Sequence, residues 1–177
     1  MSETVLVGYA TRYGTTREAA EAAAAALQEC GFEVDVQLAR DVRTLDGYSA
    51  VVLGAPLFMF HWHKDTLQFL SRHQKALMER PVAVFALGPT HDPHDEKEWT
   101  DSREQLNQEL AKFPWFTPVT AEVFGGKYDP AMLRFPLNLF AGKTQASDIR
   151  DLNAVRAWAS RLAAKLEPAV NYCFLHK

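Results

Sequence analysis

The sequence predicts an α/β fold in which helices cover both faces of a central parallel sheet. Short apolar runs with the composition of strands alternate with longer stretches of helical pattern. Two of the runs, residues 50–54 and 81–87, are apolar throughout, as expected for strands buried on both faces. The 177 residues, 47% of them hydrophobic, suffice for one substantial core. Because no repeat or low-complexity linker interrupts the alternation, we expect a single domain over residues 1–177.

The first strand is expected at residues 5–10 and the first helix at about residues 16–29. The strand run reads Val-Leu-Val-Gly-Tyr-Ala. Seven alanines between positions 19 and 26 favour a helix, and their small side chains let it lie close to the sheet. Gly31 stands where a helix of this length would end.

The remainder of the chain continues the alternation. Residues 32–38 alternate apolar and polar side chains, which predicts an edge strand with one solvated face. Further strands are expected at residues 50–54, 81–87 and 119–124, and further helices at about residues 64–77, 101–113 and 153–166.

Residues 128–143 fit neither pattern. The segment contains Met132, Phe135 and Phe140, which make it too apolar for a solvated loop, and Pro136 would interrupt a helix. We interpret it as an insertion that covers another part of the fold. It is either extra core at the sheet edge, or a lid or membrane-surface contact suited to a lipophilic ligand. It is too short to span a bilayer.

Composition excludes several classes of protein. The 19 Lys and Arg against 22 Asp and Glu give a net charge of −3 and a pI of about 6.1, unlike a basic nucleic-acid binder. No stretch approaches the roughly 20 apolar residues of a membrane span, and the N-terminus lacks a signal-peptide pattern. Cys30 and Cys173 lie far apart without a metal-type spacing, which favours a reducing compartment. We expect a cytoplasmic protein, with peripheral contact at the inner membrane face left open by the insertion.

The first candidate site is the segment between the first strand and the first helix, Thr11-Arg12-Tyr13-Gly14-Thr15-Thr16. Backbone amides and the dipole at a helix N-terminus favour phosphate, and the threonine hydroxyls add donors. Gly14 lets an oxygen approach the backbone closely. The segment is neither a Walker A loop nor a G-x-G-x-x-G loop. The alternative is a structural capping box in Thr15-Thr16-Arg17-Glu18.

Two more loops are expected at the same edge of the sheet. Residues 54–63 follow the third strand and residues 88–95 follow the fourth. Ligands of open α/β sheets bind outside the carboxyl ends of the strands. Phe58, Phe60 and Trp62 make the first of these loops aromatic. A flat heteroaromatic ring would fit there, or the aromatic side chains form a small core of their own.

The three loops and the order of the elements resemble the flavodoxin-like fold, which binds FMN. Residues 10–16 look like its phosphate loop, with Tyr13 where flavodoxins usually have threonine. Tyr13, Gly54-Ala55-Pro56, the apolar stretch after Gly125-Gly126, and residues 148–152 look more like the menaquinone-dependent protoporphyrinogen IX dehydrogenase branch. That branch more often has tryptophan at the position of Leu152. The resemblance covers nearly the whole chain and implies a three-layer sandwich with a five-stranded parallel sheet of order 2-1-3-4-5.

The resemblance also implies which residues hold the cofactor. The FMN phosphate would be held by Thr11, Arg12, Tyr13, Gly14, Thr15 and Thr16. The isoalloxazine ring would be flanked by Pro56, Leu57, Phe58, Met59, Phe60, Gly88, Pro89, Thr90 and His91. The flavin performs the redox chemistry, while the protein supplies position and electrostatics.

Five of the six histidines fall between positions 61 and 94. A metal site would combine His61 and His63 with His91 or His94, but neither a helical spacing nor a cysteine partner supports it, and we expect no metal. His61, His63 or His91 either moves a proton at the flavin or is a solvated loop residue. The acidic run at residues 92–98 is either solvated surface or a surface that repels an anionic partner or attracts a basic one.

The resemblance implies an oxidoreductase in which a porphyrinogen-like or other reduced substrate passes electrons to FMN, and a quinone or a redox protein accepts them. A flavodoxin-type electron carrier is the alternative; the weak net charge and the apolar insertion argue against it. A cofactor-free binding module on the same fold is a third hypothesis, and a nicotinamide-dependent quinone reductase a fourth. We expect a monomer or a homodimer.

Overall fold

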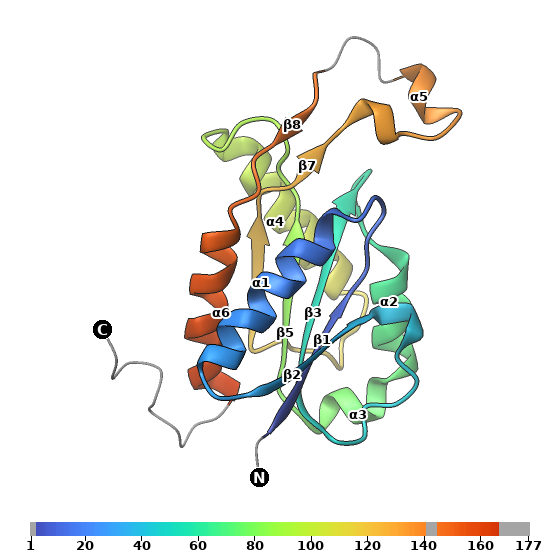
Figure 1. Cartoon of the computed structure of the whole chain (residues 1–177). Helices are drawn as coiled ribbons and strands as arrows, with labels where there is room; N and C mark the ends of the chain where they lie inside the picture. Colours follow the sequence, from blue (N-terminus) through green and yellow to red (C-terminus); the bar gives the residue numbers. More distant parts are fainter. Residues whose placement is uncertain (1–2, 141–144, 167–177) are drawn as a thin grey trace.

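The computed structural model describes residues 3–140 and 145–166 of the chain. Five parallel strands form the central sheet (Figure 1). Their order across the sheet is β2 (Glu33–Leu38), β1 (Thr4–Tyr9), β3 (Tyr48–Phe58), β5 (Val82–Leu87) and β6 (Thr120–Phe124). Numbered along the chain, the five parallel strands have the predicted order 2-1-3-4-5, which is confirmed. The alternating strand lies at an edge, as its pattern indicated.

Helices cover both faces of the sheet and enclose two cores. The first face carries α1 (Thr15–Glu29) and α6 (Leu152–Leu166), and the second carries α2 (Lys64–Arg72), α3 (Gln74–Met78) and α4 (Glu96–Leu110). Successive side chains of a strand point to opposite faces. Val5 and Val7 of β1 therefore join the first core, while Leu6 joins the second, and all three are fully buried.

The alanine-rich sequence of α1 has the packing consequence that we expected. Ala19, Ala20, Ala23 and Ala26 are fully buried, and α1 contacts α6 as well as the sheet. A helix with larger side chains on this face would be held further from both neighbours. The N-terminus of α1, and with it the candidate phosphate loop, is thus held firmly at the carboxyl edge of the sheet.

Three element boundaries differ from the sequence-based expectation. β3 continues through residues 54–58, predicted as loop, and folds back on β4 (His61–Trp62) as an antiparallel hairpin. The helix expected at residues 64–77 is divided at His73 into α2 and α3. The helix expected from residue 101 begins at Glu96, because the Asp95 carboxylate accepts hydrogen bonds from the backbone amides of Lys97 and Glu98.

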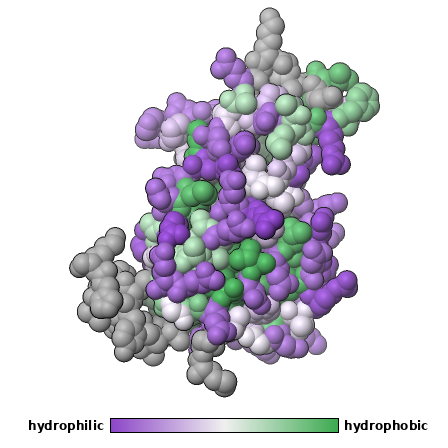
Figure 2. Space-filling model, viewed as in Figure 1, coloured by the Kyte–Doolittle hydropathy of each residue, from purple (hydrophilic) through white to green (hydrophobic). Residues whose placement is uncertain are grey.

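The insertion projects beyond the carboxyl edge of the sheet. The segment is wider than the predicted residues 128–143, because it begins with β7 (Lys127–Tyr128) and ends with β8 (Ser147–Asp148). Between these strands it contains a 3-10 turn at Pro130–Met132 and α5 (Leu137–Phe140). β7 and β8 pair antiparallel at its base. Figure 1 places α5 above the sheet, and Figure 2 shows apolar side chains gathered over this part of the molecule.

The exposed side chains of the insertion contradict the interpretation as extra core. Met132 is 42% exposed, Phe135 78% and Leu139 68%. Large apolar side chains that a protein leaves in contact with solvent often mark an interaction surface. Of the two interpretations, a lid or contact surface is the one that these exposures favour.

Within the described part of the chain, no helix combines the length and the apolar composition that crossing a membrane requires. The expectation of a reducing compartment was drawn from Cys30 and Cys173, and Cys173 lies outside the described residues.

Candidate functional site

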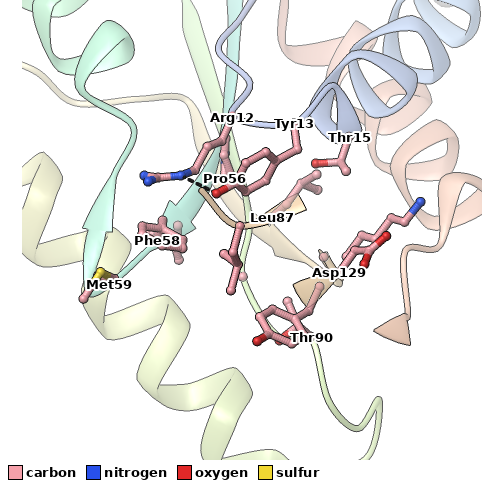
Figure 3. A pocket seen from close by; sticks show the side chains of 15 residues that line it. Arg12, Tyr13, Thr15, Pro56, Phe58, Met59, Leu87, Thr90 and Asp129 are labelled. Carbon is pink, nitrogen blue, oxygen red and sulfur yellow. Dashed lines mark hydrogen bonds between the residues drawn. The ribbon is translucent and has the colours of Figure 1, made fainter. Parts of the chain in front are cut away.

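A cleft opens at the carboxyl edge of the sheet, where the loops after β1, β3 and β5 meet the segment after β6 (Figure 3). Its volume, including the open mouth, is about 760 Å³. The lining residues are Arg12, Tyr13, Thr15, Pro56, Leu57, Phe58, Met59, Leu87, Gly88, Thr90, Gly126, Lys127, Tyr128, Asp129 and Leu133. The structure therefore brings all three predicted loops together around one cavity.

Six predicted cofactor residues do not line the cleft. Thr11 and Gly14 precede α1 in the phosphate loop, and Thr16 lies in the first turn of α1. Pro89 is buried. Phe60, 76% exposed at the hairpin tip, and His91, in the exposed loop after β5, remain outside.

α1 begins without a side-chain cap. Gly14 occupies the N-cap position in the left-handed conformation, with a φ of +82°, which glycine adopts without strain. Among the residues that the structure describes, no side chain accepts a hydrogen bond from the first turn. The capping box considered as an alternative is therefore not formed, and the amides of this turn are available to an anion.

Two threonine hydroxyls beside this turn have no partner. The Oγ1 atoms of Thr11 and Thr16 are both buried, neither makes a hydrogen bond within the described residues, and Thr16 as a whole is fully buried. An unsatisfied buried polar group costs about 1–3 kcal/mol, so such groups are normally paired. A phosphate would accept hydrogen bonds from hydroxyls and from helix amides at once. The residues present thus fit the phosphate of a flavin mononucleotide.

Arg12 places a cation inside the cleft. Its guanidinium carbon lies 3.9 Å from the centroid of the Phe58 ring, and its Nε donates to the Tyr13 hydroxyl at 3.0 Å (Figure 3). Both contacts hold the charge between the phosphate loop and the hairpin. The Asp129 carboxylate stands on another wall of the same cleft. The cleft therefore combines two cations, Arg12 and Lys127, with aromatic surface and one carboxylate. The cations favour a flat ring that gains negative charge, and the Asp129 carboxylate opposes that charge.

The β3–β4 hairpin turns through two residues with positive φ. Met59 has a φ of 47° and Phe60 a φ of 69°. A two-residue turn of this kind normally uses Asn or Gly, because other side chains are strained there. The base of the hairpin is fixed by Trp62, whose buried indole donates to the carbonyl of Ala55 at 3.2 Å. The turn directs Met59 to the cleft and leaves Phe60 exposed.

Glu98 of α4 holds the loop after β5. Its carboxylate accepts from the backbone amides of Thr90 (3.0 Å) and His91 (3.4 Å), and it contacts His91 Nδ1 at 3.0 Å. Burial alone would raise the pKa of Glu98, but these hydrogen bonds outweigh it and the pKa is lowered. The interpretation of residues 92–98 as solvated surface is therefore wrong for Glu98.

Glu98 makes the stability of this loop pH-dependent. A carboxylate whose pKa is lowered by folding stabilises the folded state above the pKa of the unfolded chain, and this stabilisation is lost as pH falls through the folded-state pKa. We expect Glu98→Gln to lower the free energy of unfolding in urea by about 1–2 kcal/mol at neutral pH. The difference from the unmodified chain should vanish in acid. A difference that is independent of pH would contradict the assignment.

The fourth wall of the cleft is formed by the base of the insertion, which sequence reasoning missed. The backbone amide of Gly126 donates to the carbonyl of Pro89 at 2.6 Å, and the Ser147 hydroxyl donates to the carbonyl of Thr90. One signal was present in the sequence, namely Gly125. A Cβ atom at Gly125 would lie 2.2 Å from the carbonyl oxygen of Ile149, so only glycine fits where the two ends of the insertion cross.

Arg150 ties this wall to the phosphate loop. Its Nη1 donates to the carbonyl of Thr15 at 3.1 Å and to Glu18 Oε2 at 2.6 Å, and its Nη2 to Asp148 Oδ2 at 2.7 Å. The Arg150 side chain is only 12% exposed. The hydrogen bond from Arg150 is the main cause of the lowered pKa of Asp148. Arg150 is thus a positioning residue that the predicted site did not include.

Replacing Arg150 should affect the cleft as well as the fold. Arg150→Gln leaves two carboxylates without their cation, and we expect it to lower the free energy of unfolding by about 2 kcal/mol and to weaken flavin binding. Arg156→Gln is the matched control, because Arg156 pairs with Glu29 at the other end of α1 and is 37% exposed. It should cost less than about 1 kcal/mol and leave flavin affinity unchanged. Equal effects of both variants on flavin affinity would contradict the positioning role.

The three histidines considered as proton carriers have other partners, and none lines the cleft. His63 caps α2 by accepting from the backbone amide of Asp65, and burial lowers its pKa. His61 Nδ1 lies 3.1 Å from Glu109, and His91 is held by Glu98. Among the described residues, no three His, Cys, Asp or Glu side chains are grouped as a metal site would require.

The chain matches the flavodoxin domain family over residues 6–144, and it belongs to that family. Membership implies a flavin-binding redox protein. The protoporphyrinogen IX dehydrogenase [quinone] of Escherichia coli K12 is 26% identical over 149 residues, which cover 78% of this chain and 81% of the relative.

Solved structures agree with the fold. A flavodoxin from the domain Archaea aligns with a TM-score of 0.57 and 14% identity, covering 92% of this chain and 98% of the other. A short-chain flavodoxin associated with a non-canonical PDU bacterial microcompartment aligns with a TM-score of 0.60 and 16% identity over 93% and 99% of the two chains. At these identities the likeness establishes the flavodoxin-like fold alone.

Proposed function

We propose that this chain is an FMN-dependent oxidoreductase that takes electrons from a reduced organic substrate and passes them to a quinone or a redox protein. The observation that carries the proposal is the pair of buried, unpartnered hydroxyls of Thr11 and Thr16 at the start of α1. They stand beside uncapped helix amides, and their neighbours Arg12, Tyr13 and Thr15 line a cleft with aromatic walls. FMN matches both features, because its phosphate suits the hydroxyl and amide donors and its flat ring suits the aromatic cleft.

The residues of the chain have distinct roles in this proposal. Thr11, Thr16 and the first turn of α1 hold the phosphate, while Phe58 and Thr90 stand on either side of the ring site. When bound, FMN supplies the redox chemistry by accepting and releasing electrons. Arg12 favours negative charge in the cleft, and the segment after β6 supplies its fourth wall.

The finer proposal concerns the substrates. The resemblance to protoporphyrinogen IX dehydrogenase supports a porphyrinogen-like donor and a quinone acceptor. The exposed apolar side chains Met132, Phe135 and Leu139 favour lipophilic reactants that are presented at a membrane surface. A protein with this surface would work at the inner face of the membrane without spanning it.

The test begins with the visible spectrum of the purified chain after incubation with FMN and gel filtration. Flavin bands that co-elute with the protein in a ratio near one are expected. Anaerobic assays then pair a porphyrinogen or another reduced donor with a quinone. Turnover of quinone supports the enzyme, whereas flavin retention with electron transfer only to protein partners supports a flavodoxin-type carrier.

A chain that binds no FMN at micromolar concentration would overturn the proposal. The cofactor-free binding module would then be the better description, because the unpartnered hydroxyls would need another anion.

A further inference from the structure

A second cavity lies next to the flavin cleft, on the other side of the Arg12–Phe58 pair. Its volume, including the open mouth, is about 770 Å³, as large as that of the cleft itself. Arg12 and Phe58 line both cavities, so the stacked pair in Figure 3 forms a shared wall. The remaining lining residues that matter here are His61, His63, Lys64 and Leu67. We call this cavity the basic groove.

The basic groove has an apolar interior and a cationic rim. Phe58 and Leu67 are half-buried, and the buried Trp62 closes the interior. Arg12 and Lys64 are exposed and carry the positive charge. No Asp or Glu is among the lining residues. A ligand must therefore offer apolar surface to the interior and a negative charge to the rim.

His63 is a polar but uncharged part of the groove at neutral pH. Burial lowers its pKa, and the cations Lys64, Arg12 and Arg40 act in the same direction, while Asp65 opposes them. Its Nδ1 already accepts the backbone amide of Asp65. The attraction for an anion therefore comes from Arg12 and Lys64.

The other histidine of the groove, His61, is held in place by a buried carboxylate. Glu109 of α4 is 3% exposed and contacts His61 Nδ1 at 3.1 Å and Lys112 Nζ at 2.6 Å. Burial alone would raise the pKa of Glu109, but the hydrogen bonds from Lys112 and His61 outweigh it and lower the pKa. Glu109 thus remains charged, fixes the imidazole at one ring nitrogen, and braces β4 against α4.

We propose that the basic groove binds a small organic anion, a flat apolar ring system that carries a carboxylate. The ring packs on Phe58 and Leu67, and the carboxylate pairs with Lys64, which lines the basic groove and not the flavin cleft. Because the two cavities have only Arg12 and Phe58 in common among their lining residues, the anion and FMN are expected to bind at the same time. This inference needs no flavin and goes beyond the proposed redox function.

The test uses 2-naphthoate as the probe and its neutral amide, 2-naphthamide, as the matched ligand. Calorimetric titrations are made with the full chain, first without and then with saturating FMN. We expect naphthoate to bind several-fold more tightly than naphthamide, with unchanged affinity when FMN is present. Displacement of naphthoate by FMN would show that the probe occupies the flavin cleft, and would overturn the proposal.

Two variants locate the site. Lys64→Gln should weaken naphthoate by about three- to tenfold and leave naphthamide unchanged, since only the charged ligand loses a partner. Lys75→Gln is the control, because Lys75 is an exposed residue of α3, and it should change the affinity for neither ligand. Leu67→Trp fills the groove and should lower the affinity for both ligands.

Unchanged naphthoate affinity in Lys64→Gln and Leu67→Trp would overturn the proposal. Circular dichroism melting verifies that each variant is folded. FMN retention is measured separately on the same samples, so a failure of the groove and a failure of the flavin proposal give different results.

Discussion

A Thr16→Glu variant is expected to lose FMN. Thr16 is fully buried and its hydroxyl has no partner, so the proposed phosphate oxygen is the group that it would meet. A carboxylate at this position repels the phosphate across a poorly solvated distance. We expect affinity to fall by about 100-fold or more, measured by the quenching of FMN fluorescence on binding.

Two further variants separate charge from packing at the same position. Thr16→Ser keeps the hydroxyl and should retain FMN nearly as well as the unmodified chain. Thr16→Val keeps the shape without the hydroxyl and should weaken FMN on the order of tenfold or more, because hydrogen bonds to charged groups contribute about 1.5–3 kcal/mol. Thermal melting followed by circular dichroism verifies the fold of all three. Full FMN retention by a folded Thr16→Glu protein would refute the phosphate assignment.

The second large effect is expected at the insertion. In a triple variant, Met132→Ser, Phe135→Ser and Leu139→Ser, the fold should survive because all three side chains are exposed. Burying a large apolar side chain contributes about 1.5–3 kcal/mol, so binding to phospholipid vesicles should fall by at least tenfold. Turnover of a long-chain quinone in those vesicles should fall with it, whereas FMN affinity should not change.

The control exploits two other exposed apolar residues. Met78 and Val119 line a shallow cavity away from the cleft, and Met78→Ser with Val119→Ser should change neither vesicle binding nor turnover. A short water-soluble quinone tests the chemistry alone and should be reduced equally by every variant. Normal vesicle binding by the triple variant would leave the insertion with a role confined to the cleft wall.

Sequence pattern was sufficient for the elements that are buried on both faces. Residues 50–54 and 82–87 belong to strands, and short, continuous apolar runs are typical of strands that are buried on both faces. The hairpin after β3 was not predictable, since Met59 and Phe60 lack the glycine or asparagine that marks a two-residue turn. The start of α4 was hidden for another reason: its first turn, Glu96 onward, is charged and shows no apolar period.

Part of the candidate site could likewise be predicted from the sequence, and part could not. The phosphate loop was recognisable because its residues are contiguous, from Thr11 to Thr16. The fourth wall was not, since it depends on the pairing of Tyr128 with Ser147 across nearly twenty residues of insertion. The roles of Glu98 and Arg150 could not be predicted either, because each acts through contacts with backbone groups that are distant in sequence.

The antiparallel pairing of β7 and β8 closes the insertion at its base before the chain enters the exposed apolar segment. The contacts that shape the cleft, from Gly126 to Pro89 and from Ser147 to Thr90, all lie at or below that closure. Asp129 and Leu133, early in the segment between the two short strands, line the cleft. The part of the segment after Leu133 is therefore replaceable. Evolution, or a designer, can lengthen it, shorten it or change its chemistry to recruit a different reactant or surface, while the machinery that holds the cofactor stays as it is.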